Sequence, residues 1–260
     1  MNEEFVGEVA VVTGGAAGMG REISLALASS GAKVLALDIN LEGLEETKTL
    51  SAQSGSNLQI FQCDVSDSES VKSAFNYLEK EFGNCTIMVA AAGIGLYTDY
   101  LSMQEVDMDR TIAVNLKGPL LCAQESLKQM EKVGKGSIIF ISSVQAFMSL
   151  YGCVVYAATK SGLIAAARTL ALETGKHGIR VNSISPGTID TPMLDRDLAS
   201  MNRDEAASFL EKVNAANVLG RIGTPAEIAD AVKYLASSKA SYVTGIDLRV
   251  DAGFSALKRI

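Results

Sequence analysis

The sequence predicts an α/β fold in which one doubly wound sheet of seven, mostly parallel strands carries helices on both faces. Three observations predict it. Short apolar runs alternate with longer segments of helical period, the runs are apolar at nearly every position, and no linker or internal repeat interrupts the 260 residues. We therefore expect a single domain over residues 1–260.

The seven apolar runs are the expected strands, because each is short and rich in β-branched residues. They lie at residues 9–12, 34–37, 58–61, 87–90, 137–141, 181–184 and 246–250. Between them lie amphipathic segments long enough to serve as the crossover helices that parallel strands require. These segments span residues 22–30, 68–82, 110–132 and 156–174.

One further helix has a readable start. Thr224, Pro225 and Glu227 supply an N-cap hydroxyl, a proline at the first helical position and the carboxylate of a capping box, so we expect a helix over residues 225–236. The segment 188–219 before it mixes apolar and charged residues. We interpret it as a lid over the site, with a helical excursion on the surface as the alternative.

The composition favours a cytoplasmic protein that binds a small molecule. A net charge of −7 repels nucleic acid, and no apolar run reaches the roughly 18 residues that cross a membrane. Residues 1–4 carry acid where a secretory signal carries base. With one histidine and four scattered cysteines, the sequence shows no metal site of the usual spacing.

A glycine-rich turn follows the first expected strand and contains Gly14, Gly18 and Gly20. Glycines let the backbone approach a pyrophosphate, and the start of the following helix offers free N–H groups. Because Gly20 is followed by Arg21 and Glu22, the turn is not a P-loop. Its position between a strand and a helix predicts a dinucleotide-binding unit.

Asp38 ends the second expected strand, 24 residues after Gly14. This is close to the ~20 residues expected for the acid that binds the adenosine ribose. Its charge would repel a 2′-phosphate, and neither Ile39 nor Asn40 offers a base. The sequence therefore predicts NAD rather than NADP, unless Asp38 only caps the next helix.

Tyr156 and Lys160 lie four residues apart in a helical segment and share one face. Ser142 and Ser143 end the fifth expected strand, at the edge where sites of α/β folds lie. An ammonium within about 4–6 Å lowers the pKa of a tyrosine from its ordinary value near 10. The pattern therefore indicates a tyrosine that acts as an acid or base, with a packed tyrosine beside an unrelated lysine as the alternative.

Six motifs in register resemble those of the short-chain dehydrogenase/reductase family and cover essentially the whole chain. They are Thr13-Gly14-x-x-x-Gly18-x-Gly20, Asp64-Val65, Asn115, Ser143, Tyr156-x-x-x-Lys160 and Pro186-Gly187-x-x-x-Thr191. The resemblance implies a Rossmann-type fold, a nicotinamide cofactor and, commonly, a homotetramer. We expect that tetramer to have 222-type symmetry, because the segment 156–174 is small and apolar on more than one face.

The resemblance also implies roles for individual residues. Ser143 would bind the substrate oxygen, Tyr156 would exchange its proton, and Lys160 would lower the pKa of Tyr156 and hold the nicotinamide ribose. Asn115 would keep a water of the proton relay, with a buried amide satisfied by backbone as the alternative. The implied cofactor-binding residues are Gly14, Ala17, Gly18, Met19, Gly20, Asp38, Ile39, Asp64, Val65, Ala91, Gly93, Tyr156, Lys160, Pro186, Gly187, Ile189 and Thr191.

One stretch departs from the family pattern. Residues 90–93 read Ala-Ala-Ala-Gly, where the family usually has Asn-Asn-Ala-Gly. We expect backbone contacts from Ala91 and Gly93 to remain. The departure therefore bears on cofactor affinity rather than on the type of reaction.

The resulting hypothesis is an NAD(H)-dependent oxidoreductase that interconverts a secondary alcohol and a ketone, or a sugar hemiacetal and a lactone. The substrate is expected to be a small polar hydroxy compound of the sugar or polyol type, without metal, nucleic acid or membrane partners. The expected substrate-side residues are Ser143, Gln145, Tyr156, Phe147 and Met193.

Two alternatives remain. One is a 3-oxoacyl thioester reductase of the acyl-carrier-protein type. Gly134 and His177 stand where its docking arginines would be sought, but Lys132, Lys135 and Lys176 lie nearby. The other is a catalytically silent NAD-binding scaffold, which predicts damage to the catalytic residues.

Overall fold

Seven strands form the sheet of the computed structural model, which describes residues 4–56 and 58–255. They are β1 (Val9–Thr13), β2 (Lys33–Asp38), β3 (Leu58–Gln62), β4 (Ile87–Ala90), β5 (Gly136–Ile141), β6 (Ile179–Pro186) and β7 (Asp247–Val250). Their order is β3-β2-β1-β4-β5-β6-β7, and every neighbouring pair is parallel. From β1 the chain adds β2 and β3 on one side and then returns to add β4 to β7 on the other side. The strand order therefore reverses between β1 and β4, which is where α/β folds bind their ligands.

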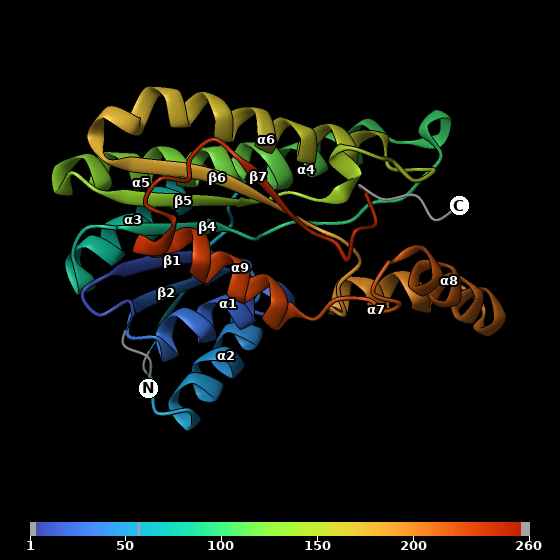
Figure 1. The fold of residues 1–260 in the computed structure, drawn as a ribbon, viewed down its shortest axis with the longest axis horizontal. Coiled ribbons are helices and arrows are strands. Elements are labelled where there is room, and N and C mark those ends of the chain that lie inside the picture. Colours follow the sequence, from blue (N-terminus) through green and yellow to red (C-terminus); the bar gives the residue numbers. More distant parts are fainter. Residues whose placement is uncertain (1–3, 57, 256–260) are drawn as a thin grey trace.

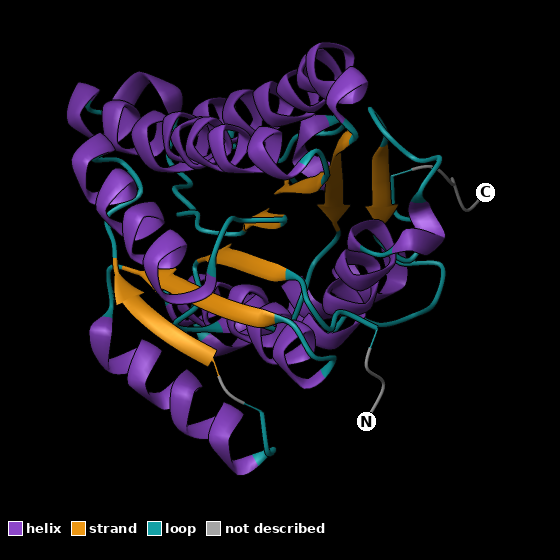
Figure 2. Ribbon diagram, turned by 90° about the vertical axis from the view of Figure 1, so that its left-hand side faces the viewer, coloured by secondary structure: helices purple, strands orange, loops and turns teal. Residues whose placement is uncertain are grey.

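Helices cover both faces of this sheet, as Figures 1 and 2 show. One face carries α1 (Gly18–Ser29), α2 (Leu41–Gln53) and α9 (Pro225–Ala236). The other carries α3 (Ser68–Phe82), α5 (Gly118–Val133) and α6 (Val154–Thr174), with α4 (Glu105–Ile112) beside α6. The predicted fold class, a Rossmann-type doubly wound sheet, is confirmed.

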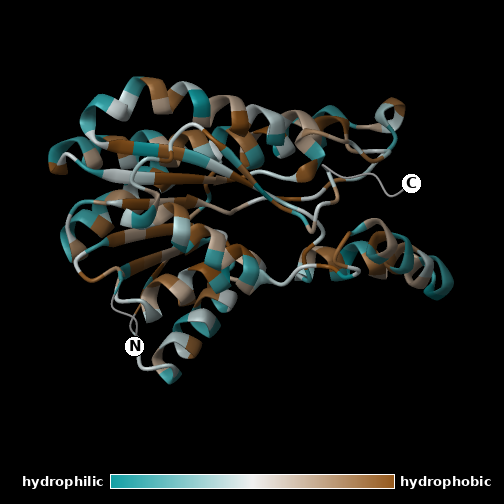
Figure 3. Cartoon of the chain, viewed as in Figure 1, coloured by the Kyte–Doolittle hydropathy of each residue, from teal (hydrophilic) through white to brown (hydrophobic). Residues whose placement is uncertain are grey.

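The core has two halves because side chains of each strand alternate between the faces. Ala10 and Val12 of β1 join the cluster under α1 and α9, whereas Val9 and Val11 join the cluster under α3, α5 and α6. β1 and β4 are therefore apolar at nearly every position, whereas β6 and β7 also carry polar residues. Figure 3 shows brown bands in the sheet between helices of mixed colour. Cys63, Cys85, Cys122 and Cys153 are free and buried.

The helices differ from the expected ones in two places, and the predicted lid segment contains helices of its own. α2 was not predicted, because its buried face holds only one large apolar residue, Leu44, beside Gly43, Thr47 and Ser51. The segment expected as one helix over 110–132 is divided by a π-helical segment, Ala113–Lys117. The predicted lid consists of two helices, α7 (Pro192–Ala199) and α8 (Arg203–Ala216), which extend away from the sheet at the lower right of Figure 1.

No helix among the described residues is long and apolar enough to cross a membrane. The same part of the chain contains no cluster of three or more His, Cys, Asp and Glu side chains that could hold a metal ion. Residues 1–3, which contribute to the expectation of a cytoplasmic protein, lie outside the described residues.

Candidate active site

Three glycines allow the turn after β1 to adopt its backbone conformation and to pack closely against neighbouring segments. A Cβ on Gly14 would lie 2.9 Å from the backbone N of Ala92, and one on Gly20 would overlap the carbonyl of Gly14. Gly14 and Gly18 have positive φ angles of 74° and 52°. α1 starts at this turn without a side-chain cap and without an acid in its first turn. The turn therefore fits the pyrophosphate of a dinucleotide.

Thr13 supplies the tie that the unusual Ala-Ala-Ala-Gly stretch lacks. Its buried hydroxyl accepts hydrogen bonds from the backbone N–H groups of Ala91 at 3.1 Å and Ala92 at 3.0 Å. The end of β4 is thus fixed to the end of β1 without the two amide side chains. Sequence reasoning used Thr13 only as a motif letter and missed this role.

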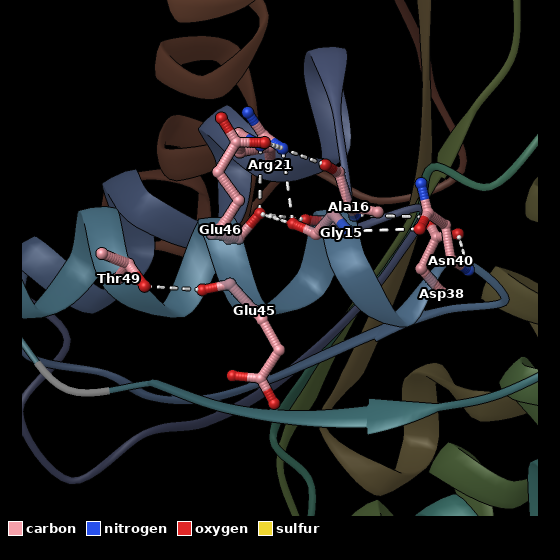
Figure 4. Close-up of polar contacts among 10 residues, drawn as sticks. Gly15, Ala16, Arg21, Asp38, Asn40, Glu45, Glu46 and Thr49 are labelled. Carbon is pink, nitrogen blue, oxygen red and sulfur yellow. Dashed lines mark hydrogen bonds and ion pairs between the residues drawn. The ribbon is translucent and has the colours of Figure 1, made fainter.

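Asp38 joins the glycine-rich turn to the start of α2 (Figure 4). Its carboxylate accepts from the backbone N–H of Ala16 at 3.1 Å and of Asn40 at 2.9 Å. The N-cap of α2 is Asn40, whose side chain accepts from Gly43 N–H. Asp38 is therefore not the N-cap of this helix, and its carboxylate links the turn to the start of α2.

Arg21 is a basic residue beside this turn, and the prediction of NAD from the sequence did not consider it. Its guanidinium donates to the carbonyl of Ala16 and to the hydroxyl of Thr47 at 3.0 Å, and it pairs with Glu46 at 2.6 Å (Figure 4). The carboxylate of Glu46 neutralises the charge of Arg21, and the Arg21 side chain holds the turn against α2. No sequence signal reveals this pair, because 25 residues separate its members.

The loop after β6 returns to the same turn. Gly187 N–H donates to the carbonyl of Val250 at 3.0 Å, and Ile189 forms an isolated parallel bridge with Gly223. A Cβ on Gly18 would lie 3.4 Å from the Thr191 side chain. The structure thus brings together turn and loop residues that lie more than 160 residues apart in the sequence, as one dinucleotide site would require.

Asp64 and Val65 follow β3 at the same edge of the sheet. One oxygen of Asp64 accepts from the N–H of Ser66 at 2.9 Å and from its hydroxyl at 2.7 Å. Val65 is buried against Gly118, where a Cβ would lie 2.9 Å from it. The other carboxylate oxygen of Asp64 and the backbone are what this pair can offer to an adenine.

Tyr156 and Lys160 lie in the first turns of α6, and both are buried. The Lys160 ammonium lies 5.6 Å from the centroid of the Tyr156 ring and donates to the carbonyl of Ile141 at 2.9 Å. A hydrogen bond links the Tyr156 side chain to Ser143 at the end of β5. The hydroxyl of Ser142 donates to the carbonyl of Lys160 at 2.9 Å, so β5 and α6 hold the three functional groups in place.

Asn115 completes this group from the π-helical segment. Its amide accepts from the N–H of Ile94 and donates to the carbonyl of Ile94, both at 2.8 Å, and it is fully buried. A Cβ on Gly93 would lie 3.4 Å from the Asn115 Oδ1 and 3.6 Å from the Lys160 Nζ. The backbone-satisfied amide is therefore present, and the second N–H of Asn115 is what remains for a water. π-Helical insertions of this kind are frequent at functional sites.

Burial sets the charge states of the Tyr–Lys pair. Burial raises the pKa of Tyr156 to about 12, although the hydrogen bond with Ser143 lowers it. Burial lowers the pKa of Lys160 to about 8. The expected lowering of the pKa of Tyr156 by Lys160 is therefore not seen in this structure, because desolvation disfavours the charged form of each group.

The predicted substrate-side residues divide into two sets. Met193 lies near Tyr97, and the Tyr97 ring lies 6.1 Å from that of Tyr156. By contrast, the Gln145 carbonyl oxygen accepts from the N–H of Leu150 at 2.9 Å, and the ring of Phe147 stacks on the guanidinium of Arg249 at 3.9 Å. Tyr97, which is not among the predicted substrate-side residues, thus lies beside Tyr156, whereas the side chains of Gln145 and Phe147 are engaged elsewhere.

Comparisons with known proteins identify the family. The family model described as enoyl-(acyl carrier protein) reductase matches residues 14–255. D-Threitol dehydrogenase of Mycolicibacterium smegmatis is 36% identical over 252 residues, covering 96% of this chain and 93% of the relative. The (3R)-3-hydroxyacyl-CoA dehydrogenase of Rattus norvegicus is 37% identical over 254 residues, covering 94% and 95%.

Solved structures agree. The crystal structure of levodione reductase superimposes with a TM-score of 0.93 at 31% identity, covering 98% of this chain and all of that one. A short-chain type dehydrogenase/reductase from Mycobacterium marinum superimposes with a TM-score of 0.90 at 28% identity, covering 98% of each chain. The chain belongs to the short-chain dehydrogenase/reductase family of oxidoreductases, which use a nicotinamide cofactor.

Proposed function

We propose that the protein oxidises a secondary alcohol of a small, neutral sugar- or polyol-type compound to the ketone with NAD, and catalyses the reverse reaction with NADH. A sugar hemiacetal going to a lactone would use the same groups. The observation that carries the proposal is the cluster of the partly buried Ser143 with the buried Tyr156 and Lys160, at the edge of the sheet that also holds the glycine-rich turn. The nicotinamide ring supplies hydride transfer when it is bound.

The chain's own residues would handle orientation and the proton. Ser143 would donate a hydrogen bond to the substrate oxygen, and Tyr156 would take the hydroxyl proton during oxidation or give it during reduction. Lys160, held by the carbonyl of Ile141, would keep a positive charge beside the phenolate as it forms. Because the pKa of Tyr156 lies near 12, the free enzyme holds the phenol, and oxidation should accelerate as pH rises.

Asp38 supports NAD as the cofactor. Its carboxylate faces the turn through the N–H of Ala16, and the basic residue nearest to that turn, Arg21, is neutralised by Glu46. A 2′-phosphate would therefore meet a negative charge without a free cation. The NAD preference rests on these two observations.

The test is NADH formation at 340 nm with polyols and simple secondary alcohols, with NAD and NADP compared at equal concentration. We expect kcat/KM to be at least about tenfold higher with NAD, the factor that corresponds to 1.4 kcal/mol. Asp38→Ala should bring the two values together, because the repulsion of the phosphate disappears. A preference of the unmodified enzyme for NADP would contradict the assignment.

A 3-hydroxyacyl thioester is the second candidate substrate, favoured by the rat 3-hydroxyacyl-CoA dehydrogenase among the relatives. Docking of an acyl carrier protein has little support, because Lys132 is paired with Glu79 at 2.8 Å and Lys135 with Glu8 at 2.6 Å. Faster NADH consumption with a 3-oxoacyl thioester than with any ketone would establish the thioester as the substrate. The intact catalytic cluster argues against a silent scaffold.

We also propose a homotetramer built on α5 and α6. A groove over α4, the π-helical segment and α5 is lined by Ile112, Leu116, Lys117, Leu120, Leu121 and Gln124. On α6, Val154 and Leu172 expose 52% and 86% of their surface. Apolar surface gathered on two adjacent helices is suited to a symmetric contact with a second copy.

A further inference from the structure

One carboxylate on the substrate side, that of Asp197, takes no part in the proposed cofactor binding or proton transfer. Asp197 lies on α7, four residues after Met193 and therefore on the same face of the helix. It is half-buried, and among the described residues no hydrogen bond or ion pair reaches its carboxylate. A partly buried carboxylate without a protein partner is free to accept a hydrogen bond from a ligand.

The face of α7 that carries Asp197 and Met193 packs toward the loop that holds Tyr97. Leu194 on the same face is buried, while Asp195 and Arg196 are exposed. A Cβ on Gly95 would lie 3.4 Å from both the Met193 sulfur and the Tyr97 hydroxyl, so this face meets the loop that carries Tyr97. Tyr97 in turn stands 6.1 Å from Tyr156, ring to ring.

The electrostatics point to the same place. After burial, the negative charge of Asp197 is among the causes that raise the pKa of Tyr97, of Tyr156 and of Cys153. Burial raises the pKa of Asp197 itself, which its neighbour Arg196 lowers. Arg196 does not pair with it but donates to the carbonyl of Pro192 at 3.2 Å. The charge of Asp197 therefore raises the pKa values of three side chains around the proposed catalytic centre, and no ion pair neutralises it among the described residues.

We propose that Asp197 determines substrate specificity by accepting a hydrogen bond from a second hydroxyl of a neutral polyol, and by disfavouring substrates that carry a carboxylate. The inference rests on the proposed alcohol oxidation at Tyr156. A hydroxyl beside the reacting carbon would give the carboxylate the donor that the protein does not provide. An anionic substituent in its place would meet like charge in a partly desolvated site.

The experiment uses three four-carbon substrates that differ in one group: 2-butanol, 2,3-butanediol and 3-hydroxybutyrate. Values of kcat/KM with NAD are measured for the unmodified enzyme, for Asp197→Asn and for Asp195→Asn. Asp195 is the matched control, because it is an exposed acid on the same helix. NADH binding, followed by the fluorescence of the nucleotide, checks that each variant is folded.

We expect the unmodified enzyme to prefer the diol over 2-butanol by about 10-fold to 100-fold, the range for a hydrogen bond to a charged group. Asp197→Asn should reduce this ratio to below about threefold and improve 3-hydroxybutyrate relative to 2-butanol. Asp195→Asn should keep the ratios of the unmodified enzyme.

Two results would overturn the inference while leaving the proposed function intact. One is a diol preference that survives in Asp197→Asn, and the other is a preference of the unmodified enzyme for 3-hydroxybutyrate. If the unmodified enzyme formed NADH with none of the three alcohols nor with any polyol, the proposed function would fail and this inference with it.

Discussion

The chemistry of the site depends on two side chains that burial pushes in opposite directions. Tyr156 is held as a phenol and Lys160 is made a weaker base, with a pKa of about 8 instead of 10.5. A lysine that remains charged at pH 7 in a buried position lowers the stability of the fold. The proposed role of this charge beside Tyr156 would explain why the residue is a lysine. At Lys160, the proposed chemistry and the stability of the fold therefore place opposite demands on one side chain.

Lys160→Met should therefore raise the free energy of unfolding at pH 7 by about 2 kcal/mol while activity is lost. The lowered pKa corresponds to roughly 3 kcal/mol, and loss of the hydrogen bond to Ile141 offsets about 1 kcal/mol of it. The penalty is complete below pH 8 and absent above pH 10.5, so the gain should shrink as pH rises between these values. Urea denaturation at pH 7 and pH 9.5 measures it, and a variant less stable than the unmodified enzyme at pH 7 would contradict this explanation.

The sequence was sufficient to predict the candidate site residues, but not the residues that hydrogen-bond or pair with them. The spacing of Tyr156 and Lys160 and the position of Asp38 could be read directly, because each depends on a local period or a short motif. The pairing of Arg21 with Glu46 and the tie from Thr13 to Ala91 could not. These contacts join segments that become neighbours only after the sheet has formed.

At the scale of elements, α9 shows what local sequence can and cannot reveal. It spans Pro225–Ala236, the predicted range, and Glu227 accepts from the N–H of Thr224 at 2.8 Å. Its other end is held by Arg180 of β6, which donates to the carbonyl of Leu235 at 2.6 Å. The capping box is visible in four consecutive residues, whereas the guanidinium arrives from 55 residues away.

Glu227→Ala should lower the free energy of unfolding by about 1 kcal/mol, the usual contribution of a helix cap. The carboxylate also pairs with Arg221 at 2.6 Å, and that hydrogen bond is the main cause that lowers the pKa of Glu227 to about 2. The loss should therefore persist down to pH 4. Equal urea midpoints for the variant and the unmodified enzyme would show that the cap contributes nothing.

α2 and the π-helical segment are the elements that sequence periodicity handled worst. α2 buries small and polar residues, so it has little apolar period, and Asn40 and Gly43 at its start resemble an ordinary turn. The residues of the π-helical segment fit an α-helix equally well, so its sequence does not reveal the π-helical geometry. Tertiary contacts, among them those of Asn115 with Ile94, decide between the two geometries.

At the scale of the whole molecule, the apolar surface on α5 and α6 predicts assembly. Light scattering coupled to gel filtration should give four times the mass of the chain. Leu172→Glu should shift this mass toward smaller species, because its 86% exposed side chain would place charge in the contact. A monomer at micromolar concentration would contradict the proposed tetramer.

In the proposed reaction, Tyr156 carries the proton of an NAD-linked alcohol oxidation. The most direct measurement compares NADH formation at 340 nm by the unmodified enzyme and by Tyr156→Phe, on the polyol that the unmodified enzyme oxidises best. We expect kcat to fall by at least about 100-fold, the lower range for loss of a general acid or base, while NADH binding changes by less than about threefold. A Tyr156→Phe enzyme with undiminished kcat would contradict it.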